Sequence, residues 1–175
     1  SGSTNTHAAN PVFLWDLFCR VGGAQAGQSD CMVIINSPDV VGDNLWLWRA
    51  DHGRGAGWTS NPNKNGLIVN GDNVTLYGLF VEHTQEYQTI WNGNGGRVYF
   101  YQSELPYDPP SQDAWRHGDV RGFASYKVAD SVTTHAAWGL GVYCVFNDAP
   151  VVCENAIETP TAPGVRMHHL VTIRL

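Results

Sequence analysis

The sequence predicts an all-β fold, specifically a right-handed parallel β-helix, from three observations. A short unit with an apolar or aromatic core pair recurs along the chain. Within each unit, aliphatic residues alternate with aromatic or charged ones, which is the period of a β-strand. The connections between units vary in length while the unit does not, as in coils that stack with their strands in one direction.

The repeated unit is clearest between Val74 and Glu82, where the pair Leu79–Phe80 ends six residues after the leading valine. Similar pairs recur along the chain, and most of them follow a valine at the same distance. We therefore predict about six coils, each with one strand built on a pair at 17–18, 45–46, 79–80, 98–99, 137–138 or 170–171.

The alternation predicts an inner aliphatic face and an outer aromatic or charged face. Leu45 and Leu47 share one parity, while Trp46 and Trp48 share the other. Because residues of neighbouring coils lie about 4.8 Å apart, each outer position should form a row across the strands. The first predicted row is Phe18, Trp46, Phe80, Tyr99 and Trp138, and the second is Arg20, Trp48, Glu82, Tyr101 and Leu140.

Asparagine and glycine mark the corners between strands. Asn36, Asn70 and Asn92 each follow a short apolar stretch and open a polar segment. These residue types tolerate the positive φ angles of tight corners. The apolar stretches therefore predict a second set of strands at 32–35, 67–69 and 89–91.

The length of 175 residues predicts a single domain, 1–175, with two excursions from the coils. The first, at 53–65, is polar and rich in glycine. The second, at 105–123, begins with Pro106, Pro109 and Pro110, which cannot donate to a strand ladder. The outermost coils expose unpaired strand edges, so we expect the chain to be a fragment or cut-down module of a longer helix, whose ends pair with another chain or another copy.

The charge balance argues against nucleic acids and anionic membranes as partners. The net charge is −6, and the only lysines are Lys64 and Lys127. Polyanion-binding proteins need basic patches, and a membrane-spanning helix needs about 18 apolar residues in a row. Neither is present in the sequence. A neutral polymer such as a glycan remains compatible with this composition.

The four cysteines form two local pairs, Cys19 with Cys31 and Cys144 with Cys153. Each pair could form a disulfide, or each thiol could be an ordinary buried residue. No cysteine or histidine spacing typical of a metal site occurs, so we expect no metal and no cofactor.

The aromatic rows admit two interpretations. Stacked rings can support one another structurally, or they can form a platform on which sugar rings pack. Under the second interpretation the substrate-binding residues are Trp46, Trp48, Phe80, Tyr99, Tyr101 and Arg49.

A group of acids near the strand ends supplies candidate catalytic residues, namely Glu82, Asp51 and Glu104, with His83 beside Glu82. Glycoside hydrolysis needs two carboxyl groups roughly 5 to 10 Å apart, a separation that one or two coils provide. Partial burial between aromatic residues would raise the pKa of Glu82. The alternative is an ordinary surface pair of Glu82 with an arginine or histidine.

Four segments, at 46–53, 78–83, 101–108 and 126–130, resemble secreted microbial pectin-lyase-like β-helix proteins. Members of this kind often carry a discoidin-type carbohydrate-binding domain and are similar to glucan-degrading glycoside hydrolases. The resemblance implies a secreted protein with a polysaccharide ligand. Two functions follow: hydrolysis of a glucan by carboxylate acid/base catalysis, or a carbohydrate-binding or cell-surface structural module without chemistry. A uronate lyase is disfavoured, because few basic residues are available to neutralise an acidic substrate.

Overall fold

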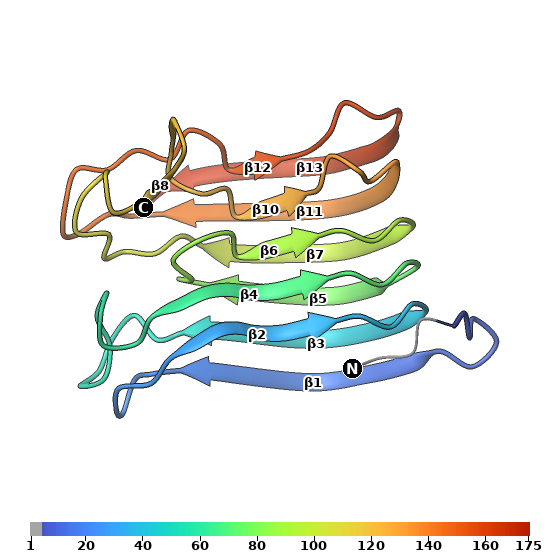
Figure 1. Cartoon of the computed structure of the whole chain (residues 1–175), viewed down its shortest axis with the longest axis horizontal. Coiled ribbons are helices and arrows are strands. Elements are labelled where there is room, and N and C mark those ends of the chain that lie inside the picture. Colours follow the sequence, from blue (N-terminus) through green and yellow to red (C-terminus); the bar gives the residue numbers. More distant parts are fainter. Residues whose placement is uncertain (1–4) are drawn as a thin grey trace.

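The computed structural model describes residues 5–175, which form thirteen β-strands and contain no helix, and therefore none that could cross a membrane. Two parallel sheets hold most of these strands, and Figure 1 shows the strands stacked in chain order. The larger sheet consists of β1 (Val12–Val21), β3 (Val40–Arg49), β5 (Thr75–Glu82), β7 (Gly96–Glu104), β11 (Thr134–Cys144) and β13 (Gly164–Arg174), side by side in that order.

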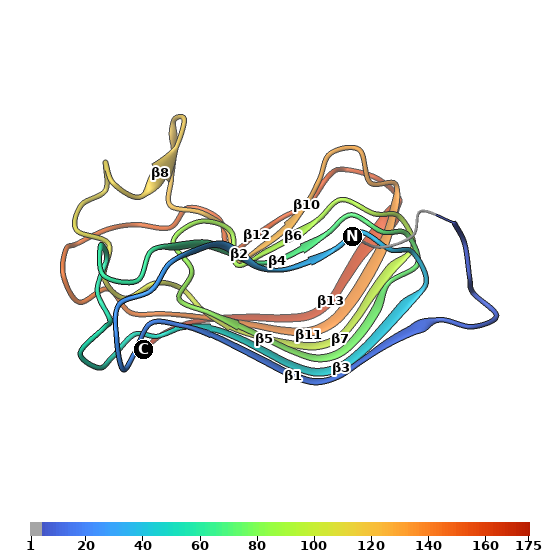
Figure 2. The same cartoon turned by 60° about the horizontal axis from the view of Figure 1, so that its bottom comes forward.

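The smaller sheet faces the larger one across the core. The chain passes from one sheet to the other after nearly every strand. It consists of β2 (Ser29–Ile35), β4 (Asn63–Val69), β6 (Thr89–Trp91), β10 (Tyr126–Val128) and β12 (Ile157–Glu158). The prediction of a second set of strands at 32–35, 67–69 and 89–91 is confirmed. A separate antiparallel hairpin, β8 (Arg116–His117) with β9 (Val120–Arg121), projects from the long connection between β7 and β10 (Figure 2).

The hydrophobic core lies between the two sheets. Leu45, Leu47, Leu79 and Val81 of the larger sheet are fully buried in it, as expected from their parity. A smaller cluster under the connection from β7 to β10 is built around Trp115. The corners are held by an asparagine ladder, in which the Asn70 amide donates to Asn36 Oδ1 at 2.7 Å and the Asn92 amide donates to Asn70 Oδ1 at 2.7 Å.

Every strand of the larger sheet contains one residue with a left-handed backbone, and these residues lie in one row across the sheet. The strands curve near their middles in Figure 2. A left-handed residue breaks the strict alternation of side chains, so the inner and outer parities exchange after it. The residues and their φ angles are Asp16 (50°), Asn44 (57°), Gly78 (63°), Phe100 (68°), Gly139 (68°) and His169 (57°).

This row explains why the predicted alignment of the fourth and fifth core strands is wrong by three residues. The prediction placed Phe80 beside Tyr99 and Glu82 beside Tyr101. In the structure, Phe80 pairs with Gln102 and Glu82 with Glu104, while Tyr99 lies between Tyr77 and Trp138. The prediction assumed that inner and outer side chains alternate without a break through Phe100. The left-handed backbone of Phe100 instead makes the side chains after it exchange their inner and outer positions.

The cysteine side chains are thiols in the structure, not disulfides. Cys31 Sγ donates to the Val33 carbonyl at 3.2 Å, and Cys153 Sγ donates to the Asn155 carbonyl at 3.2 Å. Burial raises the pKa of the Cys153 thiol to about 12, which keeps it protonated and unreactive at neutral pH.

Candidate functional site

Three acids gather where neighbouring strands of the larger sheet end. Glu82 is the last residue of β5 and Glu104 the last of β7, and the two are direct partners in the parallel ladder. Asp51 follows the end of the next strand, β3. Since parallel strands lie about 4.8 Å apart, the correct register brings Glu82 and Glu104 closer together than the predicted one did.

Glu82 is partly buried under the indole ring of Trp46. Trp46 Nε1 donates to Glu82 Oε2 at 2.7 Å. Burial raises the pKa of the Glu82 carboxyl, hydrogen bonds from Trp46 and Gln102 oppose that rise, and the charge of Asp51 adds to it. The donated hydrogen bonds favour the ionised form, so Glu82 is the better placed of the pair to carry a negative charge.

Glu104 has weaker support for its charged form. Burial raises the pKa of its carboxyl, and the neighbouring charges of Glu82 and Asp51 raise it further. The Gln102 amide contacts Glu104 Oε1 only at 3.5 Å, a long hydrogen bond. Two carboxyl groups this close do not ionise equally, and Glu104 is the one that retains its proton more readily.

His83 is almost completely buried behind the acids. Its Nδ1 lies 3.2 Å from the Leu105 carbonyl oxygen, which can only accept, so this nitrogen carries the proton in the neutral ring. Nε2 then faces Asp51 Oδ1 and Glu104 Oε2, at 3.9 Å from each. Burial lowers the pKa of His83, which favours the neutral ring, and at 3.9 Å its Nε2 lies beyond direct hydrogen-bonding distance of both acids.

Arg49 was predicted to bind substrate, and the structure contradicts that role. Its side chain is 1% exposed, and its guanidinium donates four hydrogen bonds. It holds Asp108 with two bonds of 2.8 Å and donates to the carbonyls of Asn61, at 2.9 Å, and His83, at 3.1 Å. Arg49 therefore fixes the backbone behind the acids and does not reach the surface.

An open hollow of about 460 Å³ lies on the outer face beside Glu82. The rings of Trp46 and Phe80 provide its apolar surface. The indole of Trp48 stacks on that of Trp46, with the ring centres 5.7 Å apart, and extends the apolar surface toward the strand ends. The residues that line the hollow itself are Asn44, Trp46, Phe80, Glu82 and Gln102.

The two predicted tyrosines do not lie at this hollow. Tyr101 is 1% exposed and points into the core, where its hydroxyl bonds to Ser125 at 2.8 Å, so its predicted role in substrate binding is wrong. Tyr99 does face outward, but on the other side of the left-handed row. It belongs to a stack with Tyr77 and Trp138, at ring distances of 5.0 and 4.7 Å.

Gln102 is the site residue that the sequence analysis missed. It lies between the acids and the aromatic rings, where a tyrosine was predicted. Aligning the strands by their acidic ends, Glu82 with Glu104, would have placed it correctly. That alignment was available in the sequence, since both residues end long apolar strands.

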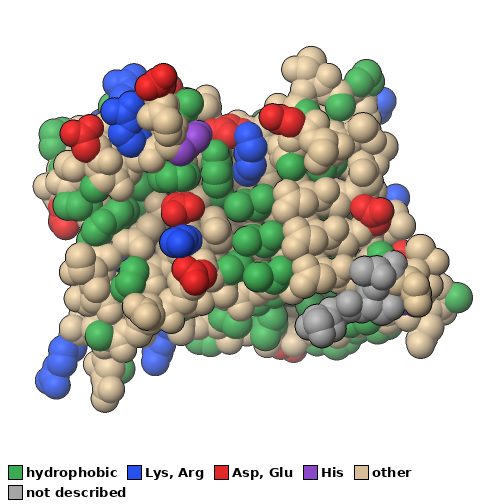
Figure 3. All heavy atoms as spheres, viewed as in Figure 1, with side chains coloured by type: hydrophobic (Ala, Val, Ile, Leu, Met, Phe, Trp, Pro, Cys, Tyr) green, Lys and Arg blue, Asp and Glu red, His purple; other side chains and the backbone are tan. Residues whose placement is uncertain are grey.

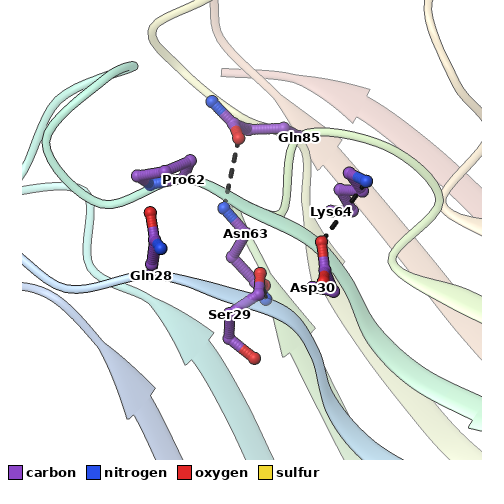
Figure 4. A pocket seen from close by; sticks show the side chains of 7 residues that line it. All are labelled: Gln28, Ser29, Asp30, Pro62, Asn63, Lys64 and Gln85. Atoms are coloured by element: carbon purple, nitrogen blue, oxygen red, sulfur yellow. Dashed lines mark hydrogen bonds and ion pairs between the residues drawn. The ribbon is translucent and has the colours of Figure 1, made fainter.

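A second, polar hollow of about 330 Å³ lies at the start of the smaller sheet (Figure 4). The backbone N–H of Asn63 donates to Gln85 Oε1 at 3.1 Å, and Lys64 Nζ forms an ion pair with Asp30 Oδ1 at 3.3 Å. Neither an aromatic ring nor one of the three site acids lines it. On the face shown in Figure 3, acidic and basic side chains are intermixed, with no extended surface of one sign.

The fold and the site together define a class: an all-β protein of parallel sheets, pectate-lyase-like, with acids at the carboxyl ends of its strands beside an aromatic hollow. Residues 1–104 match the LAM55 pectate lyase-like domain, and the chain belongs to that family. The predicted resemblance to pectin-lyase-like proteins is thus confirmed at the level of a pectate-lyase-like family.

Known relatives extend the comparison. The chain is 47% identical to an exo-beta-1,3-glucanase of Streptomyces sp. (strain SirexAA-E / ActE) over 175 residues, which is 99% of this chain and 29% of the relative. It is similar to the solved structure of sacteLam55A from Streptomyces sp. SirexAA-E, with a TM-score of 0.94 and 46% identity over 98% of this chain and 32% of that chain. A variant of sacteLam55A in complex with glucose gives a TM-score of 0.93 and 47% identity, over 94% and 30% of the two chains. The chain thus spans about a third of the length of these proteins.

Proposed function

We propose that this chain is a glucan-hydrolysing domain that cleaves a β-1,3-glucan by carboxylate acid/base catalysis. The observation that carries the proposal is the pairing of Glu82 with Glu104 at adjacent strand ends, beside an aromatic hollow. The similarity to an exo-beta-1,3-glucanase supports the choice of substrate. In this proposal, the two sheets form about six coils of a right-handed parallel β-helix that holds the acids in place.

The two acids take different roles in the proposed reaction. Glu104, whose pKa is raised by burial and by two neighbouring acids, donates its proton to the glycosidic oxygen of the leaving sugar. Glu82, whose charge is supported by the Trp46 N–H, accepts a proton from a water molecule as that water attacks the anomeric carbon. After the bond breaks, Glu82 releases its proton to solvent and Glu104 takes one up from solvent, which restores both groups with a net consumption of one water.

Asp51 and His83 support Glu104 in this scheme. The Asp51 charge disfavours ionisation of Glu104 and so helps it retain its proton. The neutral His83 ring places Nε2 3.9 Å from Glu104 Oε2, and a small movement of the protonated carboxyl group would bring the two atoms within hydrogen-bonding distance. Trp46, Trp48 and Phe80 supply the apolar surface for the sugar rings.

The proposal is tested by measuring glucose and reducing ends released from a β-1,3-glucan, with a β-1,4-glucan and an α-glucan as comparison substrates. We expect release from the β-1,3-glucan, and a loss of at least about 100-fold in the Glu104→Gln and Glu82→Gln variants. An exposed acid outside the site, Asp113→Asn, is the matched control and should leave the rate unchanged. Hydrolysis that survives Glu104→Gln would contradict the assignment.

The second candidate is a carbohydrate-binding module without chemistry. It is favoured by the large exposed aromatic surface of the outer face, including Phe13, Trp15, Phe18 and Trp46. Glucan binding without turnover, unchanged by Glu104→Gln, would support this module over the hydrolase.

Three further expectations belong with the proposal. The resemblance to secreted proteins predicts that the protein acts outside the cell, together with a discoidin-type carbohydrate-binding domain. The outermost strands β1 and β13 expose ladder edges, so we also propose that another chain or copy pairs with them. Sedimentation velocity in dilute solution tests the last point, and a monomer whose β1 and β13 amides resist hydrogen exchange would contradict it.

A further inference from the structure

Phe100 occupies a backbone conformation that is unfavourable for a bulky residue. Its φ angle is 68°, in the left-handed region, where glycine, asparagine and aspartate are the common residues. The neighbouring strands have Gly78 and Gly139 at the same position in the row. A phenylalanine here therefore costs free energy that a glycine or asparagine would not.

Burial does not explain the phenylalanine either. Phe100 is 57% exposed. Among the large apolar residues of the described chain, only Trp15 and Leu175 are more exposed. Its single aromatic partner within the described residues is Phe80, at a ring distance of 5.7 Å. A strained, exposed aromatic residue beside a site of acids points to a role in binding.

Phe100 lies between two hollows of the outer face. On one side its ring touches Phe80, which lines the hollow beside Glu82. On the other side Phe100 itself lines a hollow of about 180 Å³, roughly six water volumes. Gln102 lines both hollows, so they adjoin each other at this residue.

Two glycines of β11 border the second hollow. In the row that holds Phe18, Trp46 and Phe80 in the first three strands, β11 has Gly141, and the Tyr143 ring lies over it, 3.0 Å from where a Cβ would be. In the left-handed row, a Cβ on Gly139 would meet no atom closer than 4.0 Å. The aromatic surface is therefore interrupted beyond Phe100, and the opening is bordered by Tyr143.

We propose that Phe100 and this second hollow form a subsite for the glucosyl unit next to the one held beside Glu82. The inference rests on the proposed function, since it assigns a second sugar unit to the same glucan. The apolar face of that sugar packs on the Phe100 ring, as sugar faces pack on aromatic side chains in binding pockets. The Gln102 amide, which lines both hollows, bonds to hydroxyl groups at the junction of the two units.

The test compares binding of glucose with binding of the β-1,3-linked glucose disaccharide, by titration calorimetry on the 175-residue chain. All variants carry Glu104→Gln, so that the disaccharide is not consumed during the titration. The test variant is Phe100→Asn, because asparagine tolerates the left-handed backbone and Asn44 occupies the same row. The control is Tyr77→Asn, which removes an exposed ring on the other side of that row.

We expect Phe100→Asn to weaken disaccharide binding about fivefold to tenfold and to leave glucose binding within about twofold. Its thermal unfolding midpoint should equal or exceed that of the parent, because the backbone strain is relieved. The control should change neither affinity. Equal affinities of the parent for both sugars, or equal losses for both in Phe100→Asn, would overturn the subsite.

The outcome is separable from that of the proposed function. If Glu104→Gln abolishes hydrolysis but Phe100→Asn leaves the disaccharide preference intact, only the subsite is wrong. If no hydrolysis is found but the disaccharide preference depends on Phe100, the subsite stands and the catalytic proposal fails.

Discussion

Replacing Arg49 with methionine provides a direct test of how the site is held. Arg49 connects three segments behind the acids: the carbonyl of Asn61, the carbonyl of His83 and the carboxylate of Asp108. Methionine fills much of the same volume but donates no hydrogen bond. The substitution therefore removes the interactions without leaving a large cavity.

The expected loss follows from the groups left without a partner. Breaking a buried ion pair by removing one member costs about 3 to 5 kcal/mol. Asp108 is 23% exposed and recovers part of its hydration, but two carbonyls also lose a donor, at about 1 to 3 kcal/mol each if they stay dry. We expect a net loss of about 3 to 5 kcal/mol in the free energy of unfolding.

Urea unfolding followed by tryptophan fluorescence measures this loss by linear extrapolation. The matched control is Arg97→Met, at an exposed arginine whose guanidinium donates, among residues 5–175, only to the Gly95 carbonyl, at 3.3 Å. It should change stability by less than about 0.5 kcal/mol. A loss below about 1 kcal/mol for Arg49→Met would refute the argument that Arg49 is a structural residue of the site.

Three further predictions concern pH and packing. The pKa of Glu104 is raised above its ordinary value of 4.5 in the folded protein. The favourable contribution of this group to stability is therefore fully present below pH 4.5 and is lost as the pH rises through the folded pKa. Glu104→Gln should therefore unfold at a higher temperature than the parent at pH 7. Burial lowers the pKa of His135 from 6.5 to about 4, so the protein should lose up to about 3 kcal/mol of stability as the pH falls between these values, and His135→Gln should remove that loss. A Cβ on Gly71 would lie 1.9 Å from the Ser37 carbonyl oxygen, so Gly71→Ala should cost about 3 kcal/mol or more in urea unfolding.

Each of these predictions has its own check. The stability gain of Glu104→Gln should shrink below pH 4.5, and a gain that does not depend on pH would contradict its electrostatic origin. His168→Gln, at a partly exposed histidine, should not alter the acid sensitivity that His135 is expected to cause. Gly27→Ala, whose Cβ would come no closer than 3.7 Å to another atom, should be nearly neutral, and equal losses at Gly27 and Gly71 would disprove the packing argument.

The sequence by itself determined the six strands of the larger sheet, three of the five strands of the smaller sheet, the corners and the parallel stacking. Repeated core pairs with period-two alternation predict these strands, and Asn36, Asn70 and Asn92 mark their corners because stacked amides bond to one another there. The sequence also singled out Glu82 and Glu104, since acids that end apolar strands are conspicuous in a chain with so few charges.

The tertiary structure alone decided which residues are neighbours across the strands. A left-handed residue such as Phe100 turns every following side chain over, and alternation counted along the sequence does not reveal the φ angle of one residue. That single backbone angle moved Tyr101 into the core and placed Gln102 in the hollow. Arg49 was likewise assigned to the surface because its partner Asp108 lies 59 residues away, a distance that only folding closes.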